Sequence, residues 1–149
     1  MVVDAVMNEI IDGYEDLKPW TYYRKSYDIY LTECRFNLSE YVGFVYQINE
    51  ISTGMKYIGI KKLWKKKRNK RREKVQSDWR TYNSSCEKLV KKMEDNPADF
   101  EKVIIRLCSS VSEMKAYEAY IQLEHYFCGM WDQLYNEMVH LRVRLRKES

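Results

Sequence analysis

Alternating apolar and polar side chains near the middle of the chain predict two short strands joined by a turn. Valine and isoleucine are interleaved with tyrosine and glutamine before a turn that ends in Gly54, and Tyr57 to Gly59 form the second run. Glycine adopts a positive φ without steric cost, so we expect a β-hairpin over about Tyr41 to Ile60. Because side chains repeat every second residue along a strand, Tyr46 and Tyr57 can place both phenols on one face of the sheet.

The second half of the chain predicts one buried strand between two helices. Residues 100–108 are mostly apolar, which is typical of a central strand. The Ser-x-x-Glu pattern of a capping box occurs at 84–87 and again at 110–113, so we expect a helix to begin at each of them. Asn96-Pro97 ends the first of these helices, and the second reaches about Phe127.

The N-terminal part predicts a helix followed by an aromatic arm. Apolar residues recur at helical spacing from Val3 to Leu17, and Lys18-Pro19 ends this pattern. Residues 20–36 are rich in tyrosine and tryptophan and fit either a strand or an extended arm across the core. Stacking on nucleic acid is the alternative for this segment, although aromatic segments more often cover a core.

Two segments are basic. Residues 61–75 have few apolar positions, and we expect a helix there that needs the sheet or a ligand for its stability. At the C-terminus, apolar residues from Val139 to Leu145 alternate with His140 and arginines, which predicts a strand with one basic face. Those arginines fit either a phosphate contact or an edge strand whose charges oppose aggregation.

These elements predict an α+β fold with a small three-stranded mixed or antiparallel sheet flanked by helices. An extra N-terminal helix and arm occupy residues 1–40, the core occupies residues 41–137, and a basic strand or tail occupies residues 138–149. A chain of 149 residues with 45% apolar side chains fits one compact domain with its own core.

Several classes of protein are excluded by composition. No run of about 18 apolar residues occurs, so we expect no membrane span. Asp4 and Glu9 interrupt the N-terminal apolar positions and argue against a signal peptide. The four cysteines are scattered without a C-x-x-C pair, which favours reduced thiols in a cytoplasm over a zinc site.

Charge is unevenly distributed along the chain. The net charge is +4, but residues 61–74 hold ten basic residues and one acid, so this segment carries +9 and the remainder −5. A concentrated positive field suits a polyphosphate backbone, while a solvated helix face or flexible loop is the plain alternative. An anionic membrane is a weaker fit, because the segment lacks a broad apolar face.

An ordered set of residues carries a family resemblance. Tyr46 is followed by Tyr57 and Gly59, then by the basic segment, by Glu118 on a predicted helix and by Asn136 after a tyrosine. This arrangement resembles the GIY-YIG nuclease superfamily, in particular its phage and mobile-element members. The resemblance covers most of the chain.

The resemblance implies a metal-dependent endonuclease that hydrolyses DNA phosphodiester bonds. Glu118 would bind one Mg²⁺ or Mn²⁺ ion, which takes hard oxygen ligands. Either Tyr46 or Tyr57 would be the base or would position the attacking water, and the sequence does not choose between them. Because a free phenol has a pKa of about 10, cations such as Lys61 and Arg68 would have to lower it.

The sequence departs from the family pattern in three places. Phe44 occupies the position of the first motif's glycine. The expected catalytic arginine falls on Lys67, and lysine does not replace arginine at a bidentate phosphate contact. The adjacent Arg68 is therefore the first candidate, and Arg71, Arg72 and Arg80 stay open. A basic insertion precedes Arg80 and Tyr82. The Tyr-x-x-Ser sequence that begins at Tyr82 is similar to a segment of phage-type members.

The candidate site residues fall into two groups. The candidate catalytic residues are Tyr46, Tyr57, Lys61, Arg68, Glu118 and Asn136. The candidate DNA-binding residues are Gly59, Lys62, Lys65, Lys66, Lys67, Lys70, Arg71, Arg72, Arg80 and Tyr82.

The expected partner is double-stranded DNA, and the chain can bind it as a homodimer. We expect it to act in the cytoplasm, which is that of the host cell if a phage encodes the chain. Two other functions stay open. The chain can be a non-catalytic nucleic-acid-binding protein of the same fold. Loss of the family's catalytic arginine, whose position falls on Lys67, would favour this function. It can also be an interaction module, such as an inhibitor of host defence, in which the basic segment meets an acidic partner.

Overall fold

The computed structural model describes residues 14–16, 20–24, 29–31, 35–68, 70–140, 142, 144–145 and 147. The predicted N-terminal helix lies outside these residues except at its end. There the prediction is wrong, because Tyr14–Asp16 is strand β1, paired with β4 (Arg35–Asn37). Pairing with a neighbouring strand outweighs the local helical periodicity at this point.

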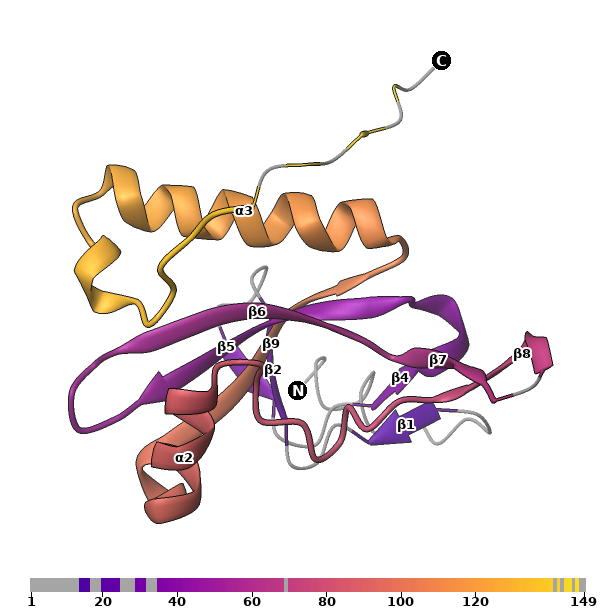
Figure 1. Ribbon diagram of the computed structural model, residues 1–149, viewed down its shortest axis with the longest axis horizontal. Helices are drawn as coiled ribbons and strands as arrows, with labels where there is room; N and C mark the ends of the chain where they lie inside the picture. Colours follow the sequence, from indigo (N-terminus) through magenta and orange to yellow (C-terminus); the bar gives the residue numbers. More distant parts are fainter. Residues whose placement is uncertain are drawn as a thin grey trace.

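A five-stranded mixed sheet forms the centre of the molecule (Figure 1). One side of it is the antiparallel trio that the sequence predicts, in which β5 lies between β9 and the edge strand β6. The sheet is larger than predicted because β2 pairs in parallel with β9, and β3 pairs with β2. In the order of the sheet, the strands are β3 (Ile29–Leu31), β2 (Thr21–Arg24), β9 (Phe100–Cys108), β5 (Gly43–Glu50) and β6 (Lys56–Lys62).

The predicted hairpin and central strand are confirmed. The hairpin is β5 and β6 joined by the turn at residues 51–55, and β9 has the predicted bounds. The aromatic segment after residue 20 takes the strand alternative, as β2 and β3, and its Trp20 is buried in the core.

The two described α-helices lie on opposite faces of the sheet (Figure 1). The long helix α3 (Val111–Phe127) crosses β5 and β6 on one face, where Met114 is fully buried. The shorter α2 (Glu87–Asp95) packs Leu89 and Met93 into the core of the other face. No helix among the described residues is long and apolar enough to cross a membrane.

The predicted caps are right for one helix and wrong for the other. Ser110 accepts a hydrogen bond from the N–H of Glu113 (3.1 Å) and so caps α3, which begins at Val111. Ser84 accepts instead from the N–H of Cys86 (3.0 Å), and α2 begins one residue later. Asn96 ends α2 as predicted, and Pro97–Asp99 form the short 3₁₀ helix η2.

The predicted helix at residues 61–75 is wrong. β6 continues to Lys62, and after the buried Leu63 the chain forms a separate two-stranded ribbon of β7 (Trp64–Lys67) and β8 (Lys70–Gln76). A helix needs an apolar stripe, which this segment lacks. An extended chain also spaces its charges by about 3.3 Å per residue, against about 1.5 Å in a helix, so like charges repel less.

The predicted C-terminal strand is also wrong. Residues 139, 140, 142, 144 and 145 lie in no helix or strand. The start of the outer edge of β6 is occupied, because Lys56 forms a bridge with Leu134 and its carbonyl accepts from the N–H of Tyr135 (2.7 Å). Alternation alone does not form a strand without a neighbouring strand to pair with.

Prediction for the arm. Trp20 packs on Phe44 (ring centroids 5.1 Å apart) and donates a buried hydrogen bond to the carbonyl of Trp79 (2.8 Å). We expect Trp20→Ala to lower the free energy of unfolding by about 3–5 kcal/mol. Trp20→Phe keeps most of the ring contact and should cost about 1–3 kcal/mol, from the unsatisfied carbonyl and the smaller ring. Urea denaturation measures both, and an unchanged midpoint for Trp20→Ala would show that the arm does not belong to the core.

Candidate active site

Two tyrosines form the centre of the candidate site. Tyr46 on β5 and Tyr57 on β6 lie on the same face of the sheet, with ring centroids 6.1 Å apart and planes inclined by 35°. Tyr46 is 1% exposed, whereas Tyr57 is half-buried at the edge strand. The hairpin register therefore brings the two phenols together as the alternation predicts, and only Tyr57 is open to solvent.

Gly59 makes room for the Tyr46 phenol. The two residues are directly opposite each other in the ladder, and a Cβ at Gly59 would overlap the Tyr46 hydroxyl and ring. Gly59 is a candidate DNA-binding residue because a glycine lets the protein backbone pass close to a substrate. In the structure, the Tyr46 ring lies where its Cβ would be. The glycine thus positions a site residue within the protein.

The loop before α2 covers the tyrosine pair. Tyr82 packs its ring edge-on against Tyr46 (6.0 Å), and the Ser85 hydroxyl lies 3.2 Å from the Tyr57 hydroxyl. Between them, the nearly buried Ser84 has a φ of +108°. A non-glycine residue with positive φ carries strain, and such strain often marks a functional site.

Burial keeps both phenols protonated. It is the main cause that raises the pKa of Tyr46, with smaller contributions from Tyr82 and Tyr57 that a hydrogen bond with Ser84 partly opposes. Burial likewise raises the pKa of Tyr57, against hydrogen bonds with Ser85 and Ser84. Burial therefore outweighs any lowering of these pKa values by nearby cations, and both hydroxyl groups can donate a hydrogen bond at neutral pH.

Lys61 is the basic residue that the described structure places beside this cluster. Its ammonium group lies 2.6 Å from Asp78 and 4.0 Å from the centre of the Tyr82 ring. The hydrogen bond from Lys61 is the main cause that lowers the pKa of Asp78. The lysine charge is therefore balanced within the protein.

Glu118 projects from α3 close to the edge strand. Burial raises its pKa to about 7, and its negative charge contributes to the raised pKa of Tyr57. Within the described residues, the carboxylate has no ion pair and no hydrogen bond. One helical turn further, Gln122 is 2% exposed, and its Oε1 atom lacks a hydrogen-bond partner in the described part of the chain.

The Glu118 carboxylate and the Gln122 oxygen are the kind of ligand that a hard divalent cation prefers. A carboxylate that loses water without gaining a cationic partner is destabilised, and an ion that keeps several waters would offset this cost. The unsatisfied oxygen of Gln122 is chemically compatible with such an ion or its water. No cluster of three or more His, Cys, Asp or Glu side chains suited to a metal occurs among the described residues, so any ion would keep a water-rich shell.

Asn136 is engaged with the backbone of β6. Its amide group donates to the carbonyl of Ile58 (2.8 Å), and its Oδ1 accepts from the N–H of the same residue (2.9 Å). Ile58 lies between Tyr57 and Gly59, so Asn136 holds the segment that carries them. In the structure its side chain therefore bonds to the backbone of β6.

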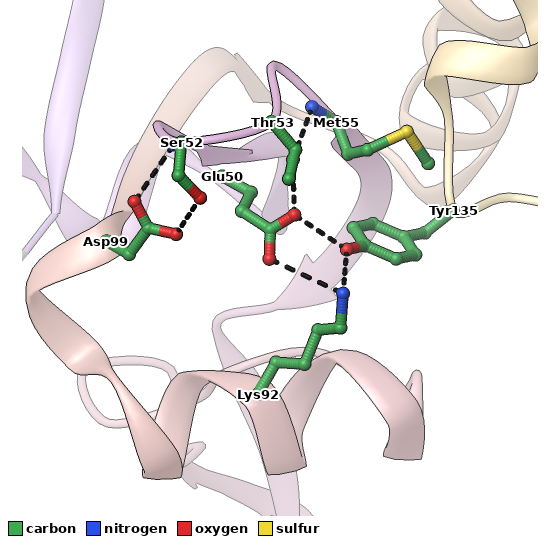
Figure 2. A network of polar contacts seen from close by, with 7 residues as sticks. All are labelled: Glu50, Ser52, Thr53, Met55, Lys92, Asp99 and Tyr135. Atoms are coloured by element: carbon green, nitrogen blue, oxygen red, sulfur yellow. Dashed lines mark hydrogen bonds and ion pairs between the residues drawn. The ribbon is translucent and has the colours of Figure 1, made fainter.

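A buried carboxylate fixes the turn of the hairpin (Figure 2). Glu50 accepts hydrogen bonds from Tyr135 (2.9 Å) and from Thr53, and lies 3.6 Å from Lys92 on α2. Lys92 also donates to the Tyr135 hydroxyl (2.8 Å). This network joins the turn to α2 and to the residue before Asn136.

The candidate arginines and the remaining lysines lie outside the tyrosine cluster. Arg68 is exposed in the turn of the ribbon, which Figure 1 shows projecting from the end of the sheet. It was chosen because it adjoins Lys67, on which the arginine of the family pattern falls. Arg80 is half-buried and packs over the Trp79 ring (4.5 Å), next to the loop of Tyr82. The exposed lysines of this region are Lys62, Lys65, Lys66 and Lys67; the side chains of Lys70, Arg71 and Arg72 lie outside the described structure.

Sequence reasoning missed four residues of this region. Ser84 and Ser85 were assigned to a helix cap, while Asp78 and Gln122 were not singled out. The Ser-Ser pair after Tyr82 was the available signal, because serines outside a helix cap hydrogen-bond locally. The contact of Asp78 with Lys61 joins residues 17 positions apart, which local patterns do not predict.

The hairpin with paired tyrosines, its facing glycine and the glutamate on the following helix define a domain of the GIY-YIG nuclease superfamily. Residues 20–137 match the family model described as "Putative endonuclease segE, GIY-YIG domain". The chain therefore belongs to this SegE-type family, and its resemblance to phage and mobile-element members is confirmed. No curated protein and no solved structure matches the chain.

Prediction for the tyrosine cluster. We expect Gly59→Ala to lower the free energy of unfolding by about 1–3 kcal/mol, because its methyl group displaces the rigid Tyr46 ring. In a Tyr46→Leu background the ring is absent, so the same substitution should cost clearly less. A double-mutant cycle by urea denaturation measures this coupling. Equal costs in both backgrounds would contradict the packing of Tyr46 over Gly59.

Prediction for Glu118. A carboxyl group whose pKa is raised from 4.5 to about 7 loses folding stability as the pH rises through that window. Without metal, Glu118→Gln should therefore raise the free energy of unfolding at pH 8 by about 1–2 kcal/mol, allowing for solvent screening, and change it little at pH 4.5. Glu94→Gln, at an exposed site on α2, is the control. Thermal melts in EDTA at several pH values test this, and a pH-independent difference would contradict it.

Proposed function

We propose that this protein is a metal-dependent endonuclease that hydrolyses DNA phosphodiester bonds. The observation that supports it best is the pair of protonated phenols on one sheet face, close enough to Glu118 for its charge to raise the pKa of Tyr57. The family description, an endonuclease, agrees with this chemistry. As a phage-type member, it would act in the cytoplasm of the host cell.

The Glu118 carboxylate would hold one Mg²⁺ or Mn²⁺ ion. When bound, the ion would supply positive charge to the non-bridging phosphate oxygens and to the departing 3′ oxygen. Glu118 is suited to this role because it is a hard oxygen donor whose charge no residue of the described structure offsets.

Tyr57 is the phenol that would meet the substrate. It is half-buried at the edge strand, and the Ser85 hydroxyl orients its hydroxyl group. As a protonated donor, it would hold the attacking water or a phosphate oxygen by a hydrogen bond. Tyr46 is buried behind it and would position Tyr57 through ring contact.

Charged residues around the pair would hold the phosphate. Lys61 can exchange part of its contact with Asp78 for a phosphate oxygen, since both partners lie at the surface of the cluster. For the arginine of the family pattern, we favour Arg80 over Arg68, because Arg80 adjoins the loop that covers the tyrosines. Asn136 would act by holding β6.

The alternative is a non-catalytic nucleic-acid-binding protein of the same fold. The exposed position of Arg68 in the ribbon turn favours it, because no arginine then occupies the expected place in the pattern. The joint presence of Tyr46, Tyr57 and Glu118 favours the enzyme.

Prediction for activity. Supercoiled plasmid should be nicked with Mg²⁺ and remain intact in EDTA. We expect Glu118→Ala to reduce the nicking rate at least 100-fold while DNA affinity changes less than about twofold, because the carboxylate acts on the reaction and not on docking. Tyr57→Phe should reduce the rate about 10- to 1000-fold. Glu94→Ala is the matched control, and a fully active Glu118→Ala enzyme would falsify the assignment.

A further inference from the structure

The β7–β8 ribbon concentrates the positive charge of the chain. Residues 64–76 contain eight lysines and arginines and one acid, Glu73, so the ribbon carries +7. It forms its own two-stranded sheet and projects beyond the end of β6 (Figure 1). Such a ribbon adds little to the core, because its apolar content is low.

The base of the ribbon is firmly attached. Leu63 is fully buried, donates its N–H to the carbonyl of Val42 (2.9 Å) and accepts from the N–H of Ser77 (2.8 Å). The Trp64 indole donates to the carbonyl of Tyr41 (3.0 Å). These bonds fix the direction in which the ribbon leaves the sheet.

The ribbon pairs like charges across its two strands. Lys66 lies directly opposite Lys74 in the antiparallel register, and both side chains are exposed. Neither lysine has an ion pair within the described residues. Like charges directly opposite each other destabilise a sheet, and a polyanion placed between them would reverse that cost.

We infer that the ribbon enters the major groove of duplex DNA. This inference deepens the proposed function. It rests on that function only in taking the substrate to be nucleic acid. The major groove of B-form DNA is about 12 Å wide and 8.5 Å deep and admits a two-stranded β-ribbon. The four residues of β7 span about 13 Å, which is long enough to reach the groove floor.

The same dimensions exclude other forms of nucleic acid. The minor groove of B-form DNA is only about 6 Å wide. The major groove of an A-form RNA duplex is too narrow for side chains to enter, and a single strand has no groove. The ribbon therefore selects duplex DNA.

The ribbon also sets where the DNA is held relative to the bond that is cut. Nine residues of nearly continuous strand separate Tyr57 from Lys66, which is at most about 30 Å. At about 3.4 Å per base pair this distance corresponds to roughly nine base pairs. The groove contact thus lies within one helical turn of the tyrosine pair.

The first test measures binding of the full-length chain in EDTA, where no cleavage occurs. We expect a 30-base-pair DNA duplex to bind at least fivefold more tightly than the same duplex carrying a bulky group at C5 of every cytosine, which fills the major groove. Saturating the minor groove of unmodified DNA with netropsin should change affinity less than twofold. An RNA duplex of the same sequence should bind at least fivefold more weakly.

The second test removes the facing lysines. Lys66→Gln with Lys74→Gln should weaken duplex binding at least fivefold and reduce the slope of log affinity against log salt by about 2. Lys91→Gln with Lys115→Gln removes the same charge from exposed helix positions and should change affinity less than twofold. Thermal melts check that the ribbon variant is folded, and relief of repulsion should leave its melting temperature equal or higher.

Three results would overturn the inference: equal affinity for the C5-modified duplex, equal affinity for duplex RNA, or unchanged affinity in the ribbon variant. Each is separate from the proposed catalysis. A chain that binds as expected but does not nick plasmid with Mg²⁺ would leave the groove contact standing and contradict the endonuclease. A chain that nicks plasmid yet binds the C5-modified duplex as tightly as the unmodified duplex would support the endonuclease and contradict the groove contact.

Discussion

The contact between the Tyr46 ring and the backbone at Gly59 is the constraint on which the site depends. It exists because the β5–β6 register places a residue without a side chain opposite a large, buried ring. That ring in turn contacts Tyr57 and Tyr82, so one cross-strand pair organises three aromatic residues from two strands and a loop. A register shift by one residue would turn the phenols to the opposite face.

Other parts of the chain hold this register from the outside. Asn136 replaces a neighbouring strand at Ile58, and the buried Glu50 fixes the turn through Tyr135 and Lys92. Edge strands are otherwise prone to slip or to pair with other chains. Both residues of the Tyr135-Asn136 pair, which forms part of the family resemblance, therefore stabilise the hairpin.

Local signals predicted part of this fold, and tertiary contacts decided the rest. The hairpin, β9 and α3 were predictable because alternation, an apolar run and a serine cap act within a few residues. The segment after Lys61 was not, because charge gives no preferred period and the buried Leu63 directs the chain into a ribbon. The pairing of Tyr46 with Tyr57 followed from register, whereas Ser85 came to the site through a contact distant in sequence, with Tyr57.

Under the proposed function, the structure separates two electrostatic tasks that one site would perform poorly. A desolvated carboxylate and protonated phenols need a region of low positive charge, since nearby cations would lower the pKa values that burial raises. A polyphosphate backbone needs dense positive charge. Placing that charge on a ribbon beyond the end of β6 leaves the tyrosine cluster with one lysine, which Asp78 balances. The division allows affinity for nucleic acid and the chemistry at Glu118 to vary independently of each other.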